Sequence, residues 1–345
     1  MTLSTDFERV SLPLADPFGI SRGTTEAAEN VLVRVQDGDG NVGVGAAAPS
    51  EYYGETPDSV ATALPDLLVA VEEVDDPHAQ QRIARALHER APEAASACGA
   101  VSVAVHDLAA RQQGEPLYRR WGLDPAAAPA TSFTIGIDTP ERMGEKAASA
   151  REAGYPILKV KLGTEDDRAR IGSIREAAPE ARIRVDANTA WTPAEAIEHT
   201  SWLADHGVEF VEQPVPADDI DGLRRVSEEG SLPVAADESC VTAEDVPRVA
   251  DAVDIVVVKV DKCGGLRAAA RQIAAADAHG LETMFGCMVA SNAGMAGACH
   301  LAPLVDYADL DGALLLADDP YDGVPMPEGR LALTAVGAGT GARPR

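Results

Sequence analysis

The chain has 345 residues, and its 56 acidic residues against 29 basic ones give a formal net charge of −27. A polyanionic surface repels nucleic acid and anionic lipid, which argues against functions that track phosphate groups. With 46% hydrophobic residues the chain can bury large cores, and its length allows about two domains. No apolar run approaches the roughly 20 residues that span a bilayer. We therefore expect a globular protein that binds neither nucleic acid nor a membrane.

The acidic residues are spread in short runs, such as 71–76, 165–167 and 218–221, rather than gathered in a tail. Together with scarce lysine, this pattern predicts a halophilic surface, adapted to high salt where screening removes self-repulsion. The alternative is an ordinarily acidic cytosolic protein. Five cysteines without CxxC spacing, and an N-terminus without an apolar signal segment, predict a reduced, cytoplasmic protein without structural zinc.

The first part of the chain has the patterns of an α+β domain, which we place at residues 1–125. Three segments have the pattern of antiparallel strands, with a hairpin turn at 37–41 between the last two: 10–21, 31–36 and 42–47. Helices are expected near 59–74, 78–90 and 94–112. The Pro-rich stretch 125–129 marks the boundary with the next domain.

From about residue 130, short Val/Ile-rich runs recur, most of them followed by an Ala-rich amphipathic stretch. The runs are 133–137, 157–162, 183–186, 210–212, 234–237, 255–260, 283–288 and 308–311. Strands alternating with helices in this number predict an α/β fold, a TIM-type barrel of seven or eight β/α units over 126–320. The alternative, an open doubly wound sheet, lacks its usual signal because no GxGxxG follows a strand. Residues 321–345 form a C-terminal segment returning toward the first domain, with a frayed end.

Three acidic residues close three successive barrel runs, namely Asp186, Glu212 and Asp237. Their spacing is one β/α unit each, so the carboxylates should stand side by side at the C-terminal mouth of the barrel. Convergent carboxylates without histidine favour a hard divalent cation, and Mg²⁺ fits best. The alternative is that strand ends often carry an Asp that caps the next helix, which would explain one position, Asp237 first of all.

Four of the five lysines in the chain form two pairs, Lys159 with Lys161 and Lys259 with Lys262. The pairs end the runs on either side of the three carboxylates. Because strand residues alternate, Lys159 and Lys161 should point to the same face, into the barrel mouth. A lysine near Mg²⁺ and a second ammonium group is expected to have a lowered pKa and to serve as a base. The alternative is a set of salt bridges in a structural barrel core.

Two bases that face each other across a metal-bound carboxylate can remove an α-proton from one face and return it on the other. That reaction is a racemisation or epimerisation. An α-proton beside a carboxylate is very weakly acidic, and its removal gives an enediolate with two negative charges. Mg²⁺ and the flanking ammonium groups would stabilise this charge as it develops.

These residues resemble the motifs of the enolase superfamily, in its muconate lactonising subgroup, over nearly the whole chain. The matching segments are Lys159-Val-Lys161, Asp186-Ala-Asn188, Glu212-Gln-Pro214, Asp237-Glu-Ser239, and Lys259 ahead of Lys262-Cys-Gly-Gly265. The resemblance implies an enolase-like fold in which the first domain caps the barrel.

The resemblance also implies a role for each site residue. Mg²⁺ would be bound by Asp186, Glu212 and Asp237, and the two acid/base residues would be Lys161 and Lys259. Lys159 would contact the substrate carboxylate, whereas Lys262 would be a supporting residue. Relatives commonly form assemblies, so a homo-oligomer is expected.

Within that subgroup the chain looks most like the dipeptide epimerases, on the segments Gly286-Cys-Met288 and Asp309-Leu-Asp311. The resemblance implies that Asp309 and Asp311 bind the α-ammonium group of a dipeptide and that Cys287 contributes to the pocket wall. Two acceptors on one strand face form a clamp for a cation that muconate or a succinylbenzoate does not have. The alternative is that both aspartates are halophilic surface acids.

The first domain should close over the barrel mouth. Arg22 is similar to a position where alanyl-glutamate epimerases place an arginine for the glutamate side chain, and Thr134 is a further implied substrate contact. A lone arginine before a Gly turn is otherwise a surface charge. A second capping loop is expected at Tyr52-Tyr-Gly-Glu55. If Glu55 faced the pocket, it would favour a basic or neutral side chain, so the second residue of the dipeptide stays open.

The sequence thus predicts Mg²⁺-dependent epimerisation of a dipeptide by 1,1-proton transfer at the carbon α to the C-terminal carboxylate. The nearest alternative is an o-succinylbenzoate synthase or muconate cycloisomerase reaction on the same site. A Schiff-base aldolase would leave the three carboxylates unexplained. A binding protein on a retired barrel would bind a ligand or Mg²⁺ without turnover.

Overall fold

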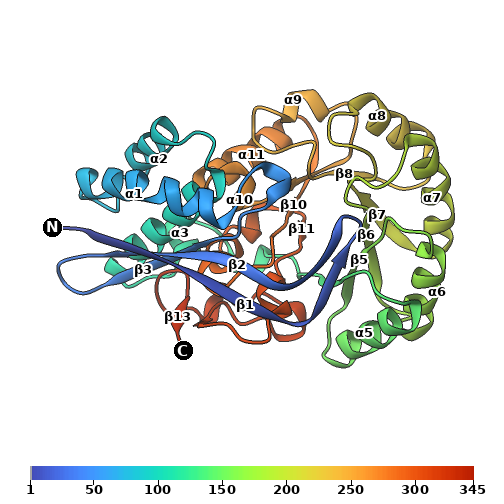
Figure 1. The fold of residues 1–345 in the computed structure, drawn as a ribbon, viewed down its shortest axis with the longest axis horizontal. Helices are drawn as coiled ribbons and strands as arrows, with labels where there is room; N and C mark the ends of the chain where they lie inside the picture. Colours follow the sequence, from blue (N-terminus) through green and yellow to red (C-terminus); the bar gives the residue numbers. More distant parts are fainter. Residues whose placement is uncertain (1) are drawn as a thin grey trace.

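The computed structural model describes residues 2–345, in which a small α+β part stands beside a β/α barrel (Figure 1). The α+β part holds a three-stranded sheet, and the barrel sheet has eight strands with helices around its outside. A long hairpin formed by the first two strands leaves the α+β part and reaches the barrel (Figure 1). This arrangement confirms the fold class that the sequence predicts.

The α+β part begins with an antiparallel sheet whose strand order is β1-β2-β3. Its strands are β1 (Ser4–Ile20), β2 (Gly23–Gln36) and β3 (Val42–Ala47). Its helices are α1 (Pro57–Val74), α2 (Gln80–Arg90), α3 (Ala95–Gln112) and the short α4 (Leu117–Arg120). The first two strands are longer than predicted because they pair from Ser4 with Gln36 up to Ile20 with Gly23. Their polar residues, exposed at the hairpin, hid this pairing from the hydrophobic pattern.

Helix α3 packs directly against β3 because two glycines of that strand leave room for its backbone. A Cβ at Gly43 would lie 2.2 Å from the Ala104 carbonyl oxygen, and a Cβ at Gly45 would lie 2.1 Å from that of Ala100. Atoms without a bond between them do not approach so closely, so any larger residue would push the helix away from the sheet. This contact fixes the core of the α+β part.

The barrel strands follow one another in sequence order around the sheet, and all neighbouring pairs are parallel. The strands are β4 (Phe133–Ile135), β5 (Ile157–Lys161), β6 (Arg182–Asp186), β7 (Val208–Glu212), β8 (Val234–Ala236), β9 (Ile255–Val258), β10 (Glu282–Phe285) and β11 (Tyr307–Ala308). A bridge between Thr131 and Ala308 joins the last strand to the segment before β4. The sequential order rules out the doubly wound alternative, whose strand order reverses at a switch point.

Helices on the outside of the barrel connect these strands. They are α5 (Pro140–Glu152), α6 (Asp167–Ala177), α7 (Pro193–Asp205), α8 (Ile220–Glu229), α9 (Val246–Val249), α10 (Val260–Cys263), α11 (Leu266–Ala278) and α12 (Asn292–Cys299). Helices α5 and α7 begin in the same way, with a Thr side chain that accepts a hydrogen bond from the first turn and a Pro directly after it. Within residues 2–345, no helix is long and apolar enough to cross a bilayer.

The C-terminal segment ends in an ordered strand pair, so our expectation of a frayed end is wrong for these residues. Strand β12 (Tyr321–Asp322) pairs with β13 (Arg343–Pro344), and Ala342, directly before β13, is fully buried. The Leu117 backbone N–H also donates to the Gly339 carbonyl oxygen at 2.8 Å. These contacts outweigh the flexibility expected from the Gly-rich composition, and they attach the segment to the α+β part.

One buried carboxylate, that of Asp107 in α3, joins three separate parts of the chain. Its Oδ2 accepts hydrogen bonds from the Val44 backbone N–H at 3.0 Å and from Arg111 Nε at 2.8 Å. Its Oδ1 accepts from the backbone N–H of Thr340 at 2.6 Å and from its hydroxyl at 3.0 Å. The side chain therefore ties the sheet and the C-terminal segment to α3.

We expect Asp107→Ala to lower the free energy of unfolding by about 3–5 kcal/mol, because it leaves buried donors without an acceptor and removes the carboxylate partner of Arg111. Urea denaturation in a constant concentration of KCl measures this change. The exposed helix residue Asp277 provides the control, and Asp277→Ala should change the unfolding free energy by about 0.5 kcal/mol or less. Equal effects of the two substitutions would contradict a joining role for Asp107.

Candidate active site

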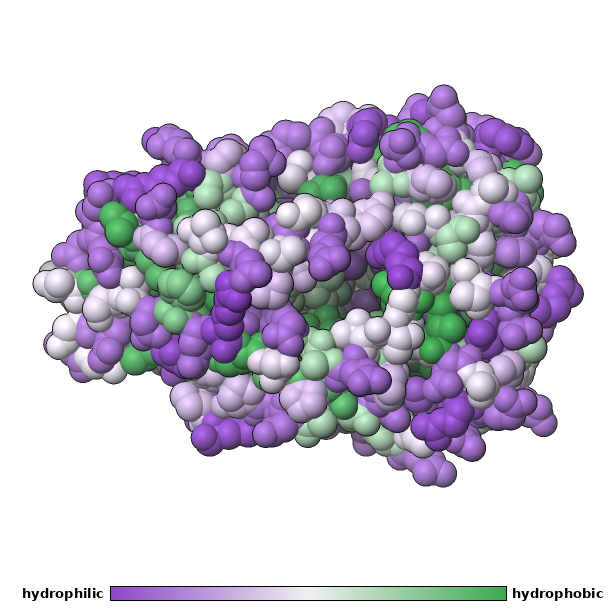
Figure 2. Space-filling view, in the orientation of Figure 1, coloured by the Kyte–Doolittle hydropathy of each residue, from purple (hydrophilic) through white to green (hydrophobic). Residues whose placement is uncertain are grey.

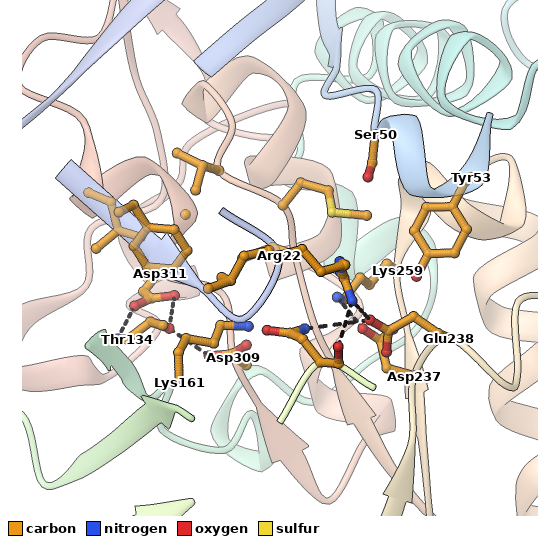
Figure 3. A pocket seen from close by; sticks show the side chains of 18 residues that line it. Arg22, Ser50, Tyr53, Thr134, Lys161, Asp237, Glu238, Lys259, Asp309 and Asp311 are labelled. Carbon is orange, nitrogen blue, oxygen red and sulfur yellow. Dashed lines mark hydrogen bonds and ion pairs between the residues drawn. The ribbon is translucent and has the colours of Figure 1, made fainter. Parts of the chain in front are cut away.

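A pocket lies at the carboxyl ends of the barrel strands, where the β1–β2 turn and the short helical segment Glu51–Tyr53 cover the barrel mouth. Figure 2 shows the surface hollowed near its centre, and Figure 3 shows the side chains around the pocket. The α+β part contributes Phe18, Ile20, Arg22, Ser50 and Tyr53 to the lining. The barrel part contributes Thr134, Lys161, Asn188, Asp237, Glu238, Lys259, Cys287, Met288, Val289, Asp309, Asp311, Gly312 and Leu315.

Most of the residues singled out in the sequence therefore meet in one place. Three others, Lys159, Asp186 and Glu212, lie behind the lining, and each side chain is at most 2% exposed. The strand register explains the grouping. Lys161 stands opposite Asp186, which in turn stands opposite Glu212, at the ends of β5, β6 and β7. Parallel strands in this register bring their last side chains to the same edge of the barrel.

The ammonium group of Lys159 lies among three carboxylates. Its Nζ is 2.7 Å from Asp309 Oδ2, 2.7 Å from Glu212 Oε2 and 3.3 Å from Asp186 Oδ2. The neighbouring Lys161 Nζ donates to Asp186 Oδ2 at 2.6 Å. Both lysines thus point into the barrel, as the alternation of strand residues predicted. In this arrangement Lys159 is engaged by protein carboxylates, and its expected contact with a substrate carboxylate stays a prediction.

The second lysine pair holds the carboxylate of Asp237. Lys259 Nζ donates to Asp237 Oδ2 at 2.7 Å, and Lys262 Nζ donates to Asp237 Oδ1 at 2.6 Å. Lys262 Nζ also contacts the carbonyl oxygens of Asp237, Cys240 and Val257 at 2.6, 3.1 and 3.0 Å. Its side chain is fully buried, so this ammonium group has no open side toward the pocket. The geometry supports the expectation that Lys262 is a supporting residue.

The carboxylates around Lys159 and Lys259 determine the electrostatics of these two lysines. Burial alone would lower the pKa of Lys159, but the adjacent carboxylates of Asp309, Glu212 and Asp186 outweigh burial and raise it. The pKa of Lys259 is raised in the same way, chiefly by Asp237. In this arrangement the two ammonium groups serve as counter-charges to the carboxylates, and the lowered pKa expected for a lysine beside Mg²⁺ stays a prediction.

The carboxylates respond unequally to the same network. Burial alone would raise the pKa of Asp186 and of Asp237, but the contacting lysines outweigh burial and hold both below the usual range. For Glu212, burial and the neighbouring Asp186 together outweigh the attraction of Lys159 and the weaker attraction of Lys259, and raise the pKa to about 8. Glu212 is therefore the least compensated carboxylate of the three.

The residues present fit a hard divalent cation in their chemistry. Both carboxylate oxygens of Glu212 are buried without a hydrogen-bond partner, because the 2.7 Å approach of Lys159 Nζ lacks hydrogen-bond alignment. Three carboxylates, one of them lacking donors, form the all-oxygen set that Mg²⁺ prefers. Within residues 2–345, no three acidic, His or Cys side chains are gathered closely enough to hold an ion as they stand. Lys159 occupies the space between the carboxylates.

Asp309 and Asp311 are buried pocket residues, which contradicts the alternative that they are surface acids. Ser132 Oγ donates to Asp309 Oδ1 at 2.5 Å, and the Thr134 backbone N–H donates to Asp311 Oδ2 at 2.5 Å. The Thr134 hydroxyl lies 3.3 Å from Asp309 Oδ1 and 3.1 Å from Asp311 Oδ1. A hydroxyl has one proton, so Thr134 donates to one of them at a time.

The two aspartates also differ in charge. Burial would raise the pKa of Asp309, but Lys159 outweighs it and holds the pKa low. For Asp311, burial and the nearby Asp309 raise the pKa to about 7. The sulfur of Cys287, which lines the same wall, has its pKa raised well above the usual value, first by burial and then by the two aspartates. A thiol in that state is a packing group.

Arg22 faces the pocket, as expected, but its guanidinium group already has protein partners (Figure 3). Its Nη1 donates to the Asn188 carbonyl oxygen at 2.8 Å and to Glu238 Oε1 at 3.0 Å. The guanidinium carbon also lies 4.5 Å from the centre of the Tyr52 ring, a cation–π contact. No role was assigned to Asn188 or Glu238 from the sequence, although both lie just after barrel strand ends, in the segments Asp186-Ala-Asn188 and Asp237-Glu-Ser239.

Glu55 does not face this pocket. Both of its carboxylate oxygens accept the Ser96 backbone N–H at 3.1 Å, at the start of α3, where a negative charge stabilises the helix. Tyr53 of the same loop lines the pocket instead. The possibility that Glu55 selects a basic substrate is therefore wrong.

Comparisons with known proteins agree with this geometry. The family model "Mandelate racemase / muconate lactonizing enzyme, N-terminal domain" matches residues 4–122, and the model "Enolase C-terminal domain-like" matches residues 142–345. The chain is similar to an L-Ala-D/L-Glu epimerase of Bacteroides thetaiotaomicron, with 35% identity over 93% of this chain and 83% of the relative.

Two solved structures are similar in fold over the full length. A dipeptide epimerase from Methylococcus capsulatus, complexed with Mg and L-Arg-D-Lys, has 33% identity, a TM-score of 0.89 and 99% of each chain covered. A dipeptide epimerase from Enterococcus faecalis, complexed with Mg and L-Leu-L-Tyr, has 31% identity and a TM-score of 0.89, over 98% of this chain and 100% of that one. The chain belongs to the mandelate racemase and muconate lactonizing enzyme family, within the enolase superfamily.

Proposed function

We propose that the protein is a Mg²⁺-dependent dipeptide epimerase, an isomerase that inverts the Cα of the C-terminal residue by 1,1-proton transfer. The observation that carries the proposal is the placement of Lys161 and Lys259. They stand at the ends of β5 and β9, four strands apart in an eight-stranded barrel, so they approach the pocket from opposite sides. Similarity to proteins named as dipeptide epimerases, two of them with Mg and a dipeptide bound, supports the proposal.

Each lysine has a defined task in this reaction. With the substrate Cα between them, one lysine removes the α-proton and the other donates a proton to the opposite face. Mg²⁺, held by Asp186, Glu212 and Asp237, would supply the positive charge that stabilises the enediolate oxygens of the substrate. Lys262 keeps the Asp237 carboxylate in place through its contacts with both the side chain and the backbone.

The clamp formed by Asp309 and Asp311 would bind the α-ammonium group of the dipeptide. Among the described residues, the Asp311 carboxylate has hydrogen bonds with Thr134 alone, so it has no cationic partner in direct contact. A substrate ammonium would provide one. Muconate and succinylbenzoate carry no cation, so they would leave this carboxylate unpaired in a buried site. The clamp therefore favours a dipeptide over these two substrates.

A Schiff-base aldolase fits the site poorly, because it would need a single lysine and would leave the carboxylates of Asp186, Glu212 and Asp237 without a role. A binding protein on the same barrel predicts that no substrate proton is exchanged. Both alternatives are tested by the same experiment as the proposal.

In D₂O with Mg²⁺ and high KCl, a free L,L-dipeptide should gain one deuterium at the C-terminal Cα and appear as both epimers. Lys161→Ala and Lys259→Ala should each lower epimerisation roughly 10²–10⁴-fold, because each removes one proton-transfer group. Mass spectrometry measures the deuterium and chiral chromatography measures the epimers. The control is the fifth lysine, Lys146 of α5, since Lys146→Ala should retain full activity. If Lys161→Ala and Lys259→Ala both kept full activity, the two-base reaction would be refuted.

Glu212→Gln should weaken Mg²⁺ binding at least tenfold, as measured by isothermal titration calorimetry, because it replaces a charged donor with a neutral one. In EDTA at pH 9 the same variant should unfold at a higher temperature than the unmodified protein. A buried carboxyl whose folded pKa is near 8, above its unfolded value, destabilises the fold increasingly as pH rises from the unfolded pKa to about 8. Near pH 4 the two proteins should differ little. A lower unfolding temperature at pH 9 would contradict the assignment of Glu212 as the uncompensated carboxylate.

Asp311→Asn should raise the KM for a free dipeptide by roughly 10–100-fold, because the substrate ammonium loses a charged partner. As pH falls through about 7, Asp311 gains a proton, so the KM of the unmodified enzyme should rise, and this dependence should vanish in the variant. Asp309 is a less informative target because it also holds Lys159 and Ser132. An o-succinylbenzoate synthase would instead convert its own substrate with no loss in the Asp311 variant.

A further inference from the structure

Two buried acceptor atoms belong to pocket-lining residues next to Arg22 and have no donor among the described residues. They are Glu238 Oε2 and Asn188 Oδ1, on side chains that line the pocket and are about nineteen-twentieths buried. Glu238 Oε1 is already used by Arg22 at 3.0 Å and lies 3.5 Å from Asn188 Nδ2. Buried acceptors normally have a donor, so these two atoms indicate where a ligand donor belongs. We call Arg22, Tyr53, Asn188 and Glu238 the Glu238 subsite.

The proposed reaction directs one particular side chain to this subsite. In that reaction the Cα would lie between Lys161 and Lys259 with its proton toward one of them, and its carboxylate would lie at the Asp186 end. The nitrogen leads to the first residue, whose ammonium group is bound by Asp309 and Asp311. The remaining substituent is the side chain of the C-terminal residue. It must point outward to the residues that cover the pocket, Arg22 and Tyr53, with Glu238 beside them (Figure 3).

An acidic side chain does not suit this subsite. Arg22 is the cation that such a side chain would need, but its Nη1 is shared between Glu238 and the Asn188 carbonyl oxygen. If Arg22 turned to a substrate carboxylate, Glu238 would be left as a buried charge without a partner, 1% exposed in its side chain. The substrate carboxylate would also lie beside those of Glu238 and Asp237, and like charges at close range repel.

We propose that the enzyme prefers a dipeptide whose C-terminal side chain donates N–H hydrogen bonds, an amide or a cation, and disfavours an acidic one. This inference rests on the proposed epimerase function and names its substrate class. The donor would bind to Glu238 Oε2 and Asn188 Oδ1, while Arg22 stays with Glu238. Arg22 thus orients Glu238 and is not the anchor of a substrate glutamate.

L-Ala-L-Gln and L-Ala-L-Glu make a matched pair of substrates, since they differ only in an amide against a carboxylate. For the unmodified enzyme, kcat/KM should be at least tenfold higher with the Gln dipeptide. L-Ala-L-Lys should also be preferred over L-Ala-L-Glu. Its kcat/KM relative to that of L-Ala-L-Gln would show whether a charged or a neutral donor binds better. A preference for L-Ala-L-Glu over both would overturn the proposal.

Glu238→Gln tests the residue itself, because it removes the buried charge and releases Arg22 at nearly constant size. The ratio of kcat/KM for the Gln dipeptide to that for the Glu dipeptide should fall at least tenfold. The ratio cancels any effect that the substitution has on folding or on the neighbouring Asp237. An unchanged ratio would overturn the role of Glu238.

L-Ala-L-Ala separates this inference from the function on which it rests. Its methyl side chain does not reach the subsite acceptors, so its deuterium exchange reports the epimerase reaction alone. Exchange of L-Ala-L-Ala without a preference for Gln over Glu would overturn the substrate assignment and leave the reaction standing. No exchange in L-Ala-L-Ala or in any of the other dipeptides would overturn the proposed function itself.

Discussion

The site depends on the mutual compensation of buried charges at the barrel mouth. Six carboxyl groups stand there with five cationic side chains among the described residues: Asp186, Glu212, Asp237, Glu238, Asp309 and Asp311 with Arg22, Lys159, Lys161, Lys259 and Lys262. No one of these groups could be buried alone, because an isolated charge in the protein interior is very costly. The compensation is incomplete at Glu212, Glu238 and Asp311, and these are the positions where the proposed metal ion, side-chain donor and substrate ammonium group would bind.

The parallel strands of the barrel position the charged residues of this network. Consecutive parallel strands end at the same edge, so a chain that places one charged residue at each strand end assembles the cluster without long loops. The α+β part contributes differently. Its β1–β2 hairpin brings a single turn over the barrel, and the cation that it delivers, Arg22, completes the ion pair with Glu238. The cover is therefore held to the barrel by charge, at the place that we propose for the substrate side chain.

The sequence predicted the repeating features best. Strand ends spaced by one β/α unit identified Asp186, Glu212 and Asp237, because the β/α units of the fold recur at a regular spacing in the sequence. Partners across the two parts of the chain were not predictable in this way. The pairing of Arg22 with Glu238 joins residues 216 positions apart, and no local pattern encodes that contact. The helix-capping role of Glu55 escaped prediction for the same reason, since its partner Ser96 belongs to another element. The ordered C-terminus was missed because composition does not report burial.

In the proposed enzyme, proton transfer and substrate selection would meet at one segment, Asp237-Glu238. The first residue is held by Lys259 and Lys262, and the second by Arg22 from the covering hairpin. Lys161 and the Asp309–Asp311 clamp come from other strands, so a change at Glu238 or Arg22 leaves one base and the ammonium site untouched. Related enzymes with the same barrel and different dipeptides are expected if specificity lies mainly in such covering contacts. The scaffold keeps the lysines opposite each other, and in the proposed enzyme the few side chains between hairpin and barrel would decide which substrate reaches them.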